Sequence, residues 1–258
     1  MGELYESSYE NYRKIVRIFK ESGKYMDYPD ACGAKEFLVL HHDVEFSLDK
    51  AYTMAKIEAE EEFFSSYMVQ ITNNAYNAFS KKNTTLIKEI AGMGHHIGLH
   101  YHLNGQTNYE DVRDGIRDQL RIFSEMIGIS IDRFSVHRPI PEVYYYKIDM
   151  PGVFNTYGPD YFTYCDNITP DTKVEVKYIA DSRYRWNYGT PNSKTLKEYP
   201  KVQFLIHPDF WGETVYDVYE MFDSILEEKS SEMINTLDME CRRFAEVKED
   251  IIDKWTKL

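Results

Sequence analysis

Short apolar runs alternate with amphipathic stretches along much of this 258-residue chain. Apolar positions at spacings of three and four predict helices over 5–22, 83–94 and 108–127, and Ser47 is placed to cap another helix that begins at Leu48. Four apolar runs predict buried strands between these helices: FLVL (37–40), SSYMVQI (65–71), DRFSVH (132–137) and KVQFLIHP (201–208). This alternation indicates an α/β fold with a mainly parallel sheet.

The pattern changes twice in the second half of the chain. From 139 to 190 the helix–strand rhythm is lost, and only 174–182 predicts a strand; a long irregular segment rich in Tyr and Asp is typical of a binding loop. Helical spacing returns over 215–258 and predicts two helices, the second one long. This tail either packs against its own domain or forms a homodimer seam. We expect a single domain over 1–258.

Composition and charge narrow the partners. A net charge of −13 argues against nucleic acid and against an anionic membrane surface, since both attract positive patches. No apolar run approaches the roughly 18 residues that a membrane span needs. The first residues lack the basic flank and apolar stretch of a signal peptide, and the three cysteines lie far apart. We therefore predict a cytoplasmic location and no disulfide framework.

All eight histidines fall in four short clusters, each at the end of, or closing, an apolar run. The clusters are His41 with His42, the four histidines of GHHIGLHYHL (94–103), His137, and His207. Parallel strands deliver side chains to one site from their carboxyl ends. The sequence therefore predicts a shared site at that edge of the sheet.

Two pairs of polar residues indicate a metal site. Asp43 and Glu45 in HHDVE are two positions apart and face the same way in an extended backbone, and so are His100 and His102. Two carboxylates and two imidazoles that converge suit a divalent ion such as zinc. A carboxylate beside the ion can act as base, while a separate histidine, such as His207, protonates the leaving group.

Five short motifs, in order, resemble the polysaccharide deacetylase family (carbohydrate esterase family 4, the NodB homology domain), and especially its branch with the first motif HDVD. They are HDVE (42–45), GHHIGLH (94–100), HRP (137–139), DSRYRW (181–186) and LIHP (205–208). The resemblance covers about 37–211. It implies an irregular (β/α) barrel of about seven strands. The helical extensions predicted over 1–24 and 214–258 lie outside the resemblance.

The resemblance also implies a role for each residue that matches a motif. These roles are Asp43 as base, Glu45 and His100 as metal ligands, Arg138 as the residue that orients Asp43, Asp181 as the partner of His207, His207 as acid, and Trp186 and Leu205 as sugar contacts.

The chain departs from the family pattern at the metal site. Family members usually carry a second metal histidine four residues after the first, where this chain has Asn104. We expect His102 to replace it, with His96 as the alternative. Glu45 stands where the branch has aspartate, and its reach is longer by one methylene. A shifted register, with Asp43 on the metal, stays open.

We therefore expect a metal-dependent hydrolase that removes an acetyl group from an N-acetylated sugar. The expected cofactor is a divalent metal, zinc, because zinc suits the predicted ligands. The expected substrate is a cytoplasmic intermediate of surface polysaccharide synthesis. The alternative is a catalytically inactive sugar-binding or scaffold protein that has lost the metal, which Asn104 and Glu45 favour. An unrelated barrel metallohydrolase is disfavoured, because such enzymes usually carry HxH on the first strand and here it follows the third apolar run.

Overall fold

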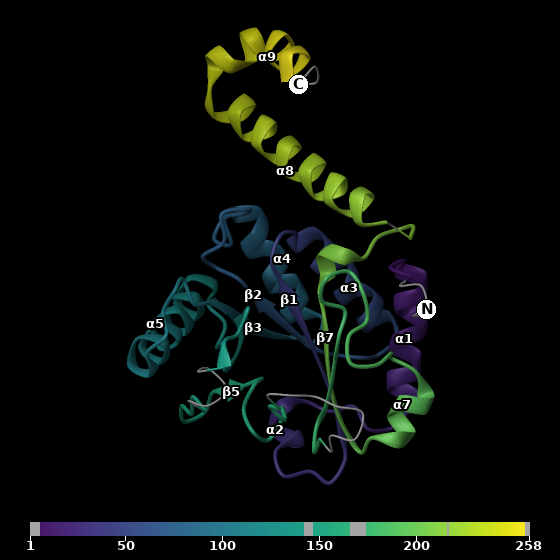
Figure 1. Cartoon of the computed structure of the whole chain (residues 1–258). Coiled ribbons are helices and arrows are strands. Elements are labelled where there is room, and N and C mark those ends of the chain that lie inside the picture. The colour runs from purple at the N-terminus through teal and green to yellow at the C-terminus, as the bar shows by residue number, and fades with distance from the viewer. Residues whose placement is uncertain (1–5, 142–146, 166–173, 216, 256–258) are drawn as a thin grey trace. The chain divides into compact units, whose positions relative to one another are not determined.

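The computed structural model describes residues 6–141, 147–165, 174–215 and 217–255 (Figure 1). The chain divides into two compact units, Met1–Tyr216 and Asp217–Leu258. Every residue to which the sequence assigns chemistry lies in the first unit. A single domain over the whole chain stays a prediction.

One parallel sheet forms the framework of the first unit. Within the described residues its strand order is β5-β4-β3-β2-β1-β7-β6, and every pairing is parallel. The strands are β1 Phe37–Val44, β2 Ser66–Val69, β3 His96–His102, β4 Arg133–His137, β5 Phe154–Asn155, β6 Lys177–Ala180 and β7 Lys201–Ile206. The sheet curls and is surrounded by helices (Figure 1), which confirms the predicted irregular barrel of about seven strands.

The helices of this unit largely follow the predicted spacing. They are α1 Tyr9–Glu21, α2 Tyr28–Ala31, α3 Leu48–Glu60, α4 Lys81–Gly92, α5 Tyr109–Ile127 and α7 Ser193–Glu198, with a 3-10 turn, η1, over Pro208–Phe210. The Ser47 hydroxyl accepts a hydrogen bond from the Lys50 amide and so caps α3, as predicted. The sequence pattern did not reveal α2, α7 or β5, which are all short.

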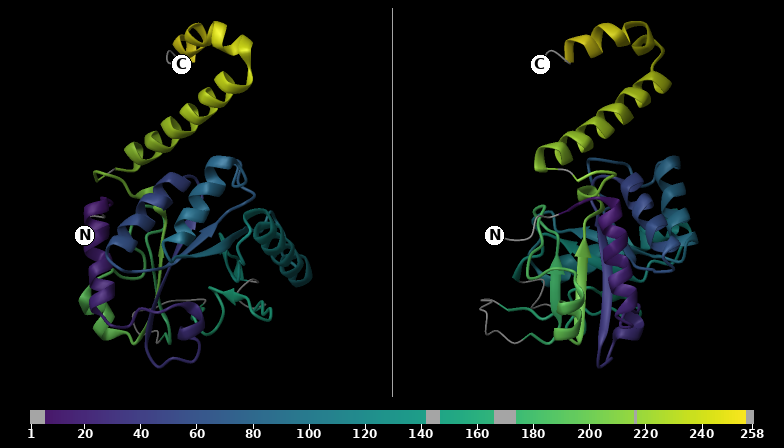
Figure 2. Two further views of the ribbon diagram at one scale, coloured as in Figure 1. Left: turned by 180° about the vertical axis from the view of Figure 1, so that it is seen from behind. Right: turned by 90° about the vertical axis from the view of Figure 1, so that its right-hand side faces the viewer.

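The two faces of the sheet differ in chemistry. On β1, Leu38 and Leu40 face outward and pack with Val16 and Phe19 of α1. Figures 1 and 2 show α1 and α3 on this outer side. The alternate positions of β1 face inward and include His41 and Asp43, both buried. The polar residues of the predicted site therefore lie inside the curled sheet.

The curl of the sheet decides which inner side chains meet. Two strands lie between β1 and β4, and in a flat sheet three spacings of about 4.8 Å would hold these strands roughly 14 Å apart. Yet Ser135 Oγ on β4 lies 2.6 Å from Asp43 Oδ1 on β1. Gly98 on β3 makes room for two neighbouring side chains: a Cβ there would lie 2.1 Å from Sδ of Met68 and 2.8 Å from Cγ of Arg133.

A buried carboxylate ties α1 and α3 to the outer face. Glu58 of α3 is fully buried and accepts hydrogen bonds from the Tyr12 hydroxyl on α1 and, at 2.6 Å, from the Ser65 hydroxyl. His42 Nε2 on β1 lies 2.8 Å from the same carboxylate. The hydrogen bonds and the charges of His42 and His95 outweigh burial and lower the pKa of Glu58.

The second unit consists of α8, Val218–Glu240, and α9, Arg242–Trp255. The sequence pattern predicted the second helix as the long one, but the break falls at Cys241, whose φ of −126° and ψ of 98° are extended, so the first is longer. No helix in the described part of the chain combines the length and apolar character that a bilayer crossing requires. The predicted homodimer through this tail stays a prediction.

Replacing Glu58 with Gln should lower the free energy of unfolding by about 3–5 kcal/mol, because His42 then loses its buried partner. Glu60→Gln is the matched control: Glu60 lies two residues away, is 56% exposed in its side chain and pairs with Arg13 at 2.6 Å. Its loss should cost under about 1 kcal/mol. Urea denaturation of both variants measures the difference, and equal costs would contradict a buried network centred on Glu58.

Candidate metal centre

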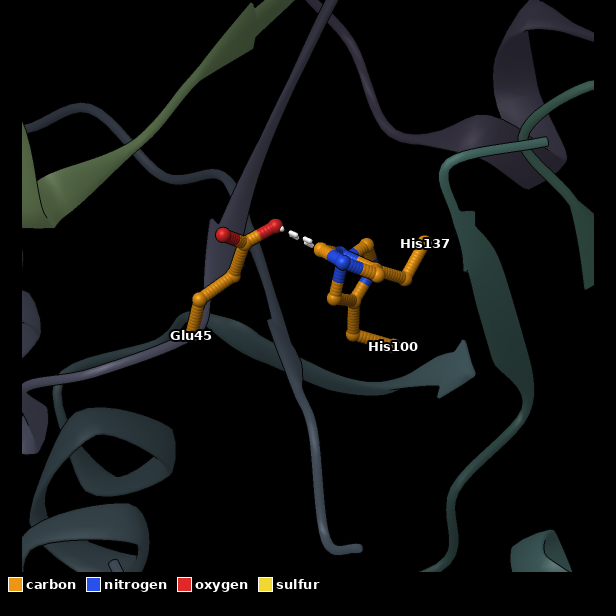
Figure 3. Close-up of side chains that lie close together, drawn as sticks. All are labelled: Glu45, His100 and His137. Carbon is orange, nitrogen blue, oxygen red and sulfur yellow. Dashed lines mark hydrogen bonds and ion pairs between the residues drawn. The ribbon is translucent and has the colours of Figure 1, made fainter. Parts of the chain in front are cut away.

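Three side chains from three strands converge at the carboxyl edge of the sheet. Glu45 follows β1, His100 lies on β3 and His137 ends β4, and one ligand atom from each lies within 4.8 Å of the others (Figure 3). Glu45 Oε1 is 2.7 Å from His137 Nδ1 and 3.2 Å from His100 Nε2. The two imidazole nitrogens are 3.1 Å apart.

A chain of hydrogen bonds lies behind His100. The Ser135 hydroxyl donates to Asp43 Oδ1 at 2.6 Å, and its oxygen lies 2.7 Å from His100 Nδ1. Since the hydroxyl hydrogen is used on Asp43, His100 Nδ1 must be the donor in the second bond. This arrangement turns Nε2 of His100 toward Glu45 and His137.

Opposite charges shift the pKa values of these groups. Burial alone would raise the pKa of Glu45 and of Asp43, but His100 outweighs it for both, through a hydrogen bond and its charge, and holds both pKa values well below their usual range. Burial lowers the pKa of His100, yet Asp43 and Glu45 outweigh burial and raise it to about 9. Without an ion, His100 is therefore positively charged near neutral pH and lies 3.2 Å from both carboxylates.

The donor set fits a zinc-like ion. One carboxylate and two imidazoles are the protein ligands of several catalytic zinc sites. A tetrahedral ion with bonds of about 2.0–2.1 Å holds its ligand atoms roughly 3.3 Å apart, so the atoms of Glu45, His100 and His137 need to separate by only a few tenths of an ångström. Glu45 and His137 are each 15% exposed in their side chains, which leaves the site open on one side. The far nitrogen of His100 is held by hydrogen bonds, as in most histidine-ligated sites.

An imidazole–carboxylate pair follows β6 and β7. His207 Nδ1 lies 2.7 Å from Asp181 Oδ1, and the same carboxylate accepts from the His207 amide and, at 3.0 Å, from Trp211 Nε1. The ring of His207 stacks on Phe210. Burial lowers the pKa of His207, but Asp181 outweighs it and, with the charges of Glu45 and Asp43, raises the pKa to about 9. The pair proposed from the sequence, Asp181 with His207, is thus brought together.

The histidine stretch contributes differently from what the sequence led us to expect. His102 lies outside the group of three: its ring stacks on His137 with centroids 5.0 Å apart, and its Nδ1 accepts from the Asn104 amide at 2.9 Å. His96, the alternative, lies 3.2 Å from Asp27 at the opposite end of β3. His137 stands with Glu45 and His100 instead.

The sequence predicted that all eight histidines share one site, but the structure separates them. His42 and His95 lie on the outer face, where both approach Glu58, at 2.8 and 3.3 Å. His41 faces inward, and its Nε2 lies 3.9 Å from Asp43 Oδ1. Burial lowers the pKa of His41 to about 4, so this ring is neutral beside Asp43.

The structure does not test the roles predicted for three further residues, and these roles stay predictions. Arg138 is exposed and has a φ of 47°, which turns the chain as β4 ends. Ser135 donates a hydrogen bond to Asp43, the residue that Arg138 is predicted to orient. Trp186 is half-buried, with its ring 6.3 Å from that of Trp211. Leu205 is buried on β7, opposite His41.

Sequence reasoning missed His137 as a candidate ligand, although it noted HRP as a motif. The strand register places His137 opposite His102 and Ser135 opposite His100. Ser135 and His137 are two positions apart on β4 and so share a face. The alternation with a period of two in DRFSVH indicates that Ser135 and His137 share a face. Only the strand register shows that this face lies beside His100 and His102.

Comparison of the sequence with models of protein families and with curated proteins finds no match. Comparison with solved structures finds similar chains. A family 4 carbohydrate esterase from Streptococcus mutans is 10% identical, with a TM-score of 0.48 over 82% of this chain and 87% of that one. A family 4 pseudoenzyme from Bacillus anthracis is 12% identical, with a TM-score of 0.44 over 77% of this chain and 62% of that one.

A third similar structure is IcaB from Ammonifex degensii, which is 14% identical, with a TM-score of 0.42 over 63% of this chain and 84% of that one. The similar structures thus include members of the family that the five motifs resemble. The chain spans less than two thirds of the pseudoenzyme's length. At 10–14% identity the similarity transfers neither an activity nor a substrate to this chain.

Replacing Asp181 with Asn should lower the pKa of His207 from about 9, because burial is then opposed only by the charges of Glu45 and Asp43. The raised pKa contributes stability that is fully present below about pH 6.5 and is lost as pH rises through about 9. The extra cost of the variant in unfolding free energy should therefore shrink over that range.

A nitrogen-detected NMR titration of the metal-free protein measures the pKa of His207 directly, with His102 as internal control. His102 should titrate unchanged in the variant. An unchanged midpoint for His207 would contradict the role given to Asp181.

Proposed function

We propose that this protein is a metal-dependent hydrolase that removes the acetyl group from an N-acetylated amino sugar. The observation that carries the proposal is the convergence of Glu45, His100 and His137, at the same edge of the sheet as the pair of His207 and Asp181. A bound divalent ion supplies Lewis acidity, which lowers the pKa of water and polarises a carbonyl oxygen.

The residues of this chain then divide the remaining tasks. Glu45, His100 and His137 hold the ion, and Ser135 and Asp43 keep His100 turned toward it.

Asp43 is the proposed base. Its contacts with Ser135 and His100 use Oδ1, so Oδ2 is the atom that would take a proton from the attacking water. His207 is the proposed acid: Asp181 fixes Nδ1, and Nε2 would give a proton to the departing amine. Water and the amide are consumed, and acetate and the amine are released. The raised pKa of His207 keeps its imidazole protonated, and so able to act as acid, near neutral pH.

The finer parts of the proposal rest on the sequence. An acetylated amino sugar or glycan intermediate as substrate, sugar contacts by Trp186 and Leu205, and a cytoplasmic location follow from the motif resemblance and the composition. Zinc is the proposed ion because a carboxylate and two imidazoles suit it.

A sugar-binding or scaffold protein without metal is the second candidate. Asn104 favours it, since the position that usually carries a metal histidine in the resembled family offers none here. The hydrogen bonds of Glu45 with His100 and His137 also satisfy these groups without an ion. Purified protein that stays metal-free after zinc is offered, yet binds an acetylated sugar, would establish this candidate and overturn the hydrolase.

His137→Ala should abolish tight binding of one zinc equivalent, while His102→Ala should retain it. The two imidazoles are stacked neighbours and form a matched pair, but only His137 shares the ligand group. Zinc content after dialysis measures both, and release of acetate from N-acetylated amino-sugar oligomers should follow the zinc. Loss of zinc from the His102 variant alone would return His102 to the site and contradict the proposed ligand set.

A further inference from the structure

Asp209, two residues beyond His207, holds the loop that carries Glu45. Its side chain is buried, with 1% of the residue exposed. Oδ2 accepts from the backbone amides of Glu45 at 3.3 Å and Phe46 at 3.1 Å, and Oδ1 accepts from the amide of Ser47 at 2.7 Å. Three successive amides of the segment after β1 therefore point at one carboxylate from the segment after β7.

This arrangement satisfies backbone groups that the sheet no longer pairs. Buried amides need acceptors, and successive amides turned to one side form a concave site for a negative charge. The carbonyl side of the same segment is held too: Asn73 Nδ2 donates to the Glu45 carbonyl at 2.6 Å, and the Tyr76 hydroxyl donates to the Val44 carbonyl at 2.9 Å. The backbone of Glu45 is thus fixed from both sides.

The position of Asp209 links the two halves of the site. The chain runs from His207 directly into η1, which contains Asp209, and Lys50 Nζ donates to the Asp209 carbonyl at 3.1 Å. One carboxylate therefore joins the segment of the proposed acid to that of the proposed metal carboxylate. Glutamate has one more rotatable bond than aspartate, so its carboxylate reaches a defined point only if its backbone is fixed.

We propose that Asp209 is a positioning residue that sets the Glu45 carboxylate against His100 and His137. The inference rests on the proposed metal site. Asp209 acts through the backbone of Glu45 and does not itself touch the ligand atoms. A role limited to anchoring the start of α3 predicts a loss of stability with no change in the contact between Glu45 and His137.

Asp209→Asn tests the proposal, with Asp49→Asn as the control. Asn keeps the shape but offers an NH₂ group where an acceptor is needed. Asp49 lies in the first turn of α3, is 47% exposed in its side chain and pairs with Lys82 at 2.6 Å, so its variant perturbs the start of α3 without removing an acceptor from the Glu45 segment. Zinc affinity should fall about 10-fold or more in Asp209→Asn, the usual effect of losing a group that orients a ligand, and stay unchanged in Asp49→Asn.

A second measurement needs no metal. The ¹⁵N shift of His137 Nδ1 reports its hydrogen bond with Glu45, and this shift should move toward that of a free imidazole in Asp209→Asn only. Unchanged zinc affinity with an unchanged His137 signal overturns the inference, as does an equal change in Asp49→Asn. Wild-type protein that binds no zinc would remove the proposed function, and the His137 signal would still decide the role of Asp209.

Asp209→Glu keeps the inference testable if the Asn variant does not fold. This variant retains both acceptor oxygens and displaces them by one methylene, so zinc affinity and the His137 signal should change in the same direction, by less. Wild-type values for both in a folded Asp209→Glu protein would overturn the proposal.

Discussion

The whole site depends on a contact between side chains whose strands are not neighbours. Asp43 stands on β1 and Ser135 on β4, with β2 and β3 between them, yet their oxygens lie 2.6 Å apart. A flat sheet would hold these strands roughly 14 Å apart, which is beyond the reach of an aspartate and a serine. Only a curled sheet brings them together. The same curl brings Glu45 to His137, so the candidate metal centre and the hydrogen bonds behind it have one cause.

Burial makes any unpaired charge costly in this interior. Asp43 and His100 are almost completely buried, and each would be costly to hold as an unpaired charge. The hydrogen bonds of the Ser135 hydroxyl and the opposite charges of imidazole and carboxylate offset that cost. The lowered pKa of Asp43 and the raised pKa of His100 reflect this mutual stabilisation. A divalent ion would take over the positive charge that His100 now carries. Nε2 of His100 already faces Glu45 and His137 without an ion, as the proposed site requires.

The sequence predicted regular elements well where one face is apolar. The five-residue stripe of α5 is buried in full, and it comprises Val112, Ile116, Leu120, Phe123 and Ile127. The FLVL strand, in contrast, continues to Val44, because its inward polar residues are buried and paired, which a hydropathy pattern cannot detect. The two-residue β5 and the six-residue α7 are too short to show a period.

The candidate site was predicted in outline, but the group of side chains that converges in the structure contains His137 and not His102. Spacing within a strand showed that His100 and His102 share a face, but the ligand set depends on which strands are neighbours and on their register. That register pairs His102 with His137, and the Asn104 amide occupies Nδ1 of His102. Likewise, Ser135 and Asp209 lie outside the five sequence motifs. Their importance comes from contacts between segments 92 and about 162 residues apart in the chain.

X-ray absorption at the zinc edge of the zinc-loaded wild-type protein tests the account most directly, because it counts the imidazole ligands on the ion. The account predicts one tightly bound zinc with two imidazole ligands and a carboxylate, completed by light oxygen ligands. A zinc with three imidazoles, or a protein that retains no zinc, would contradict it.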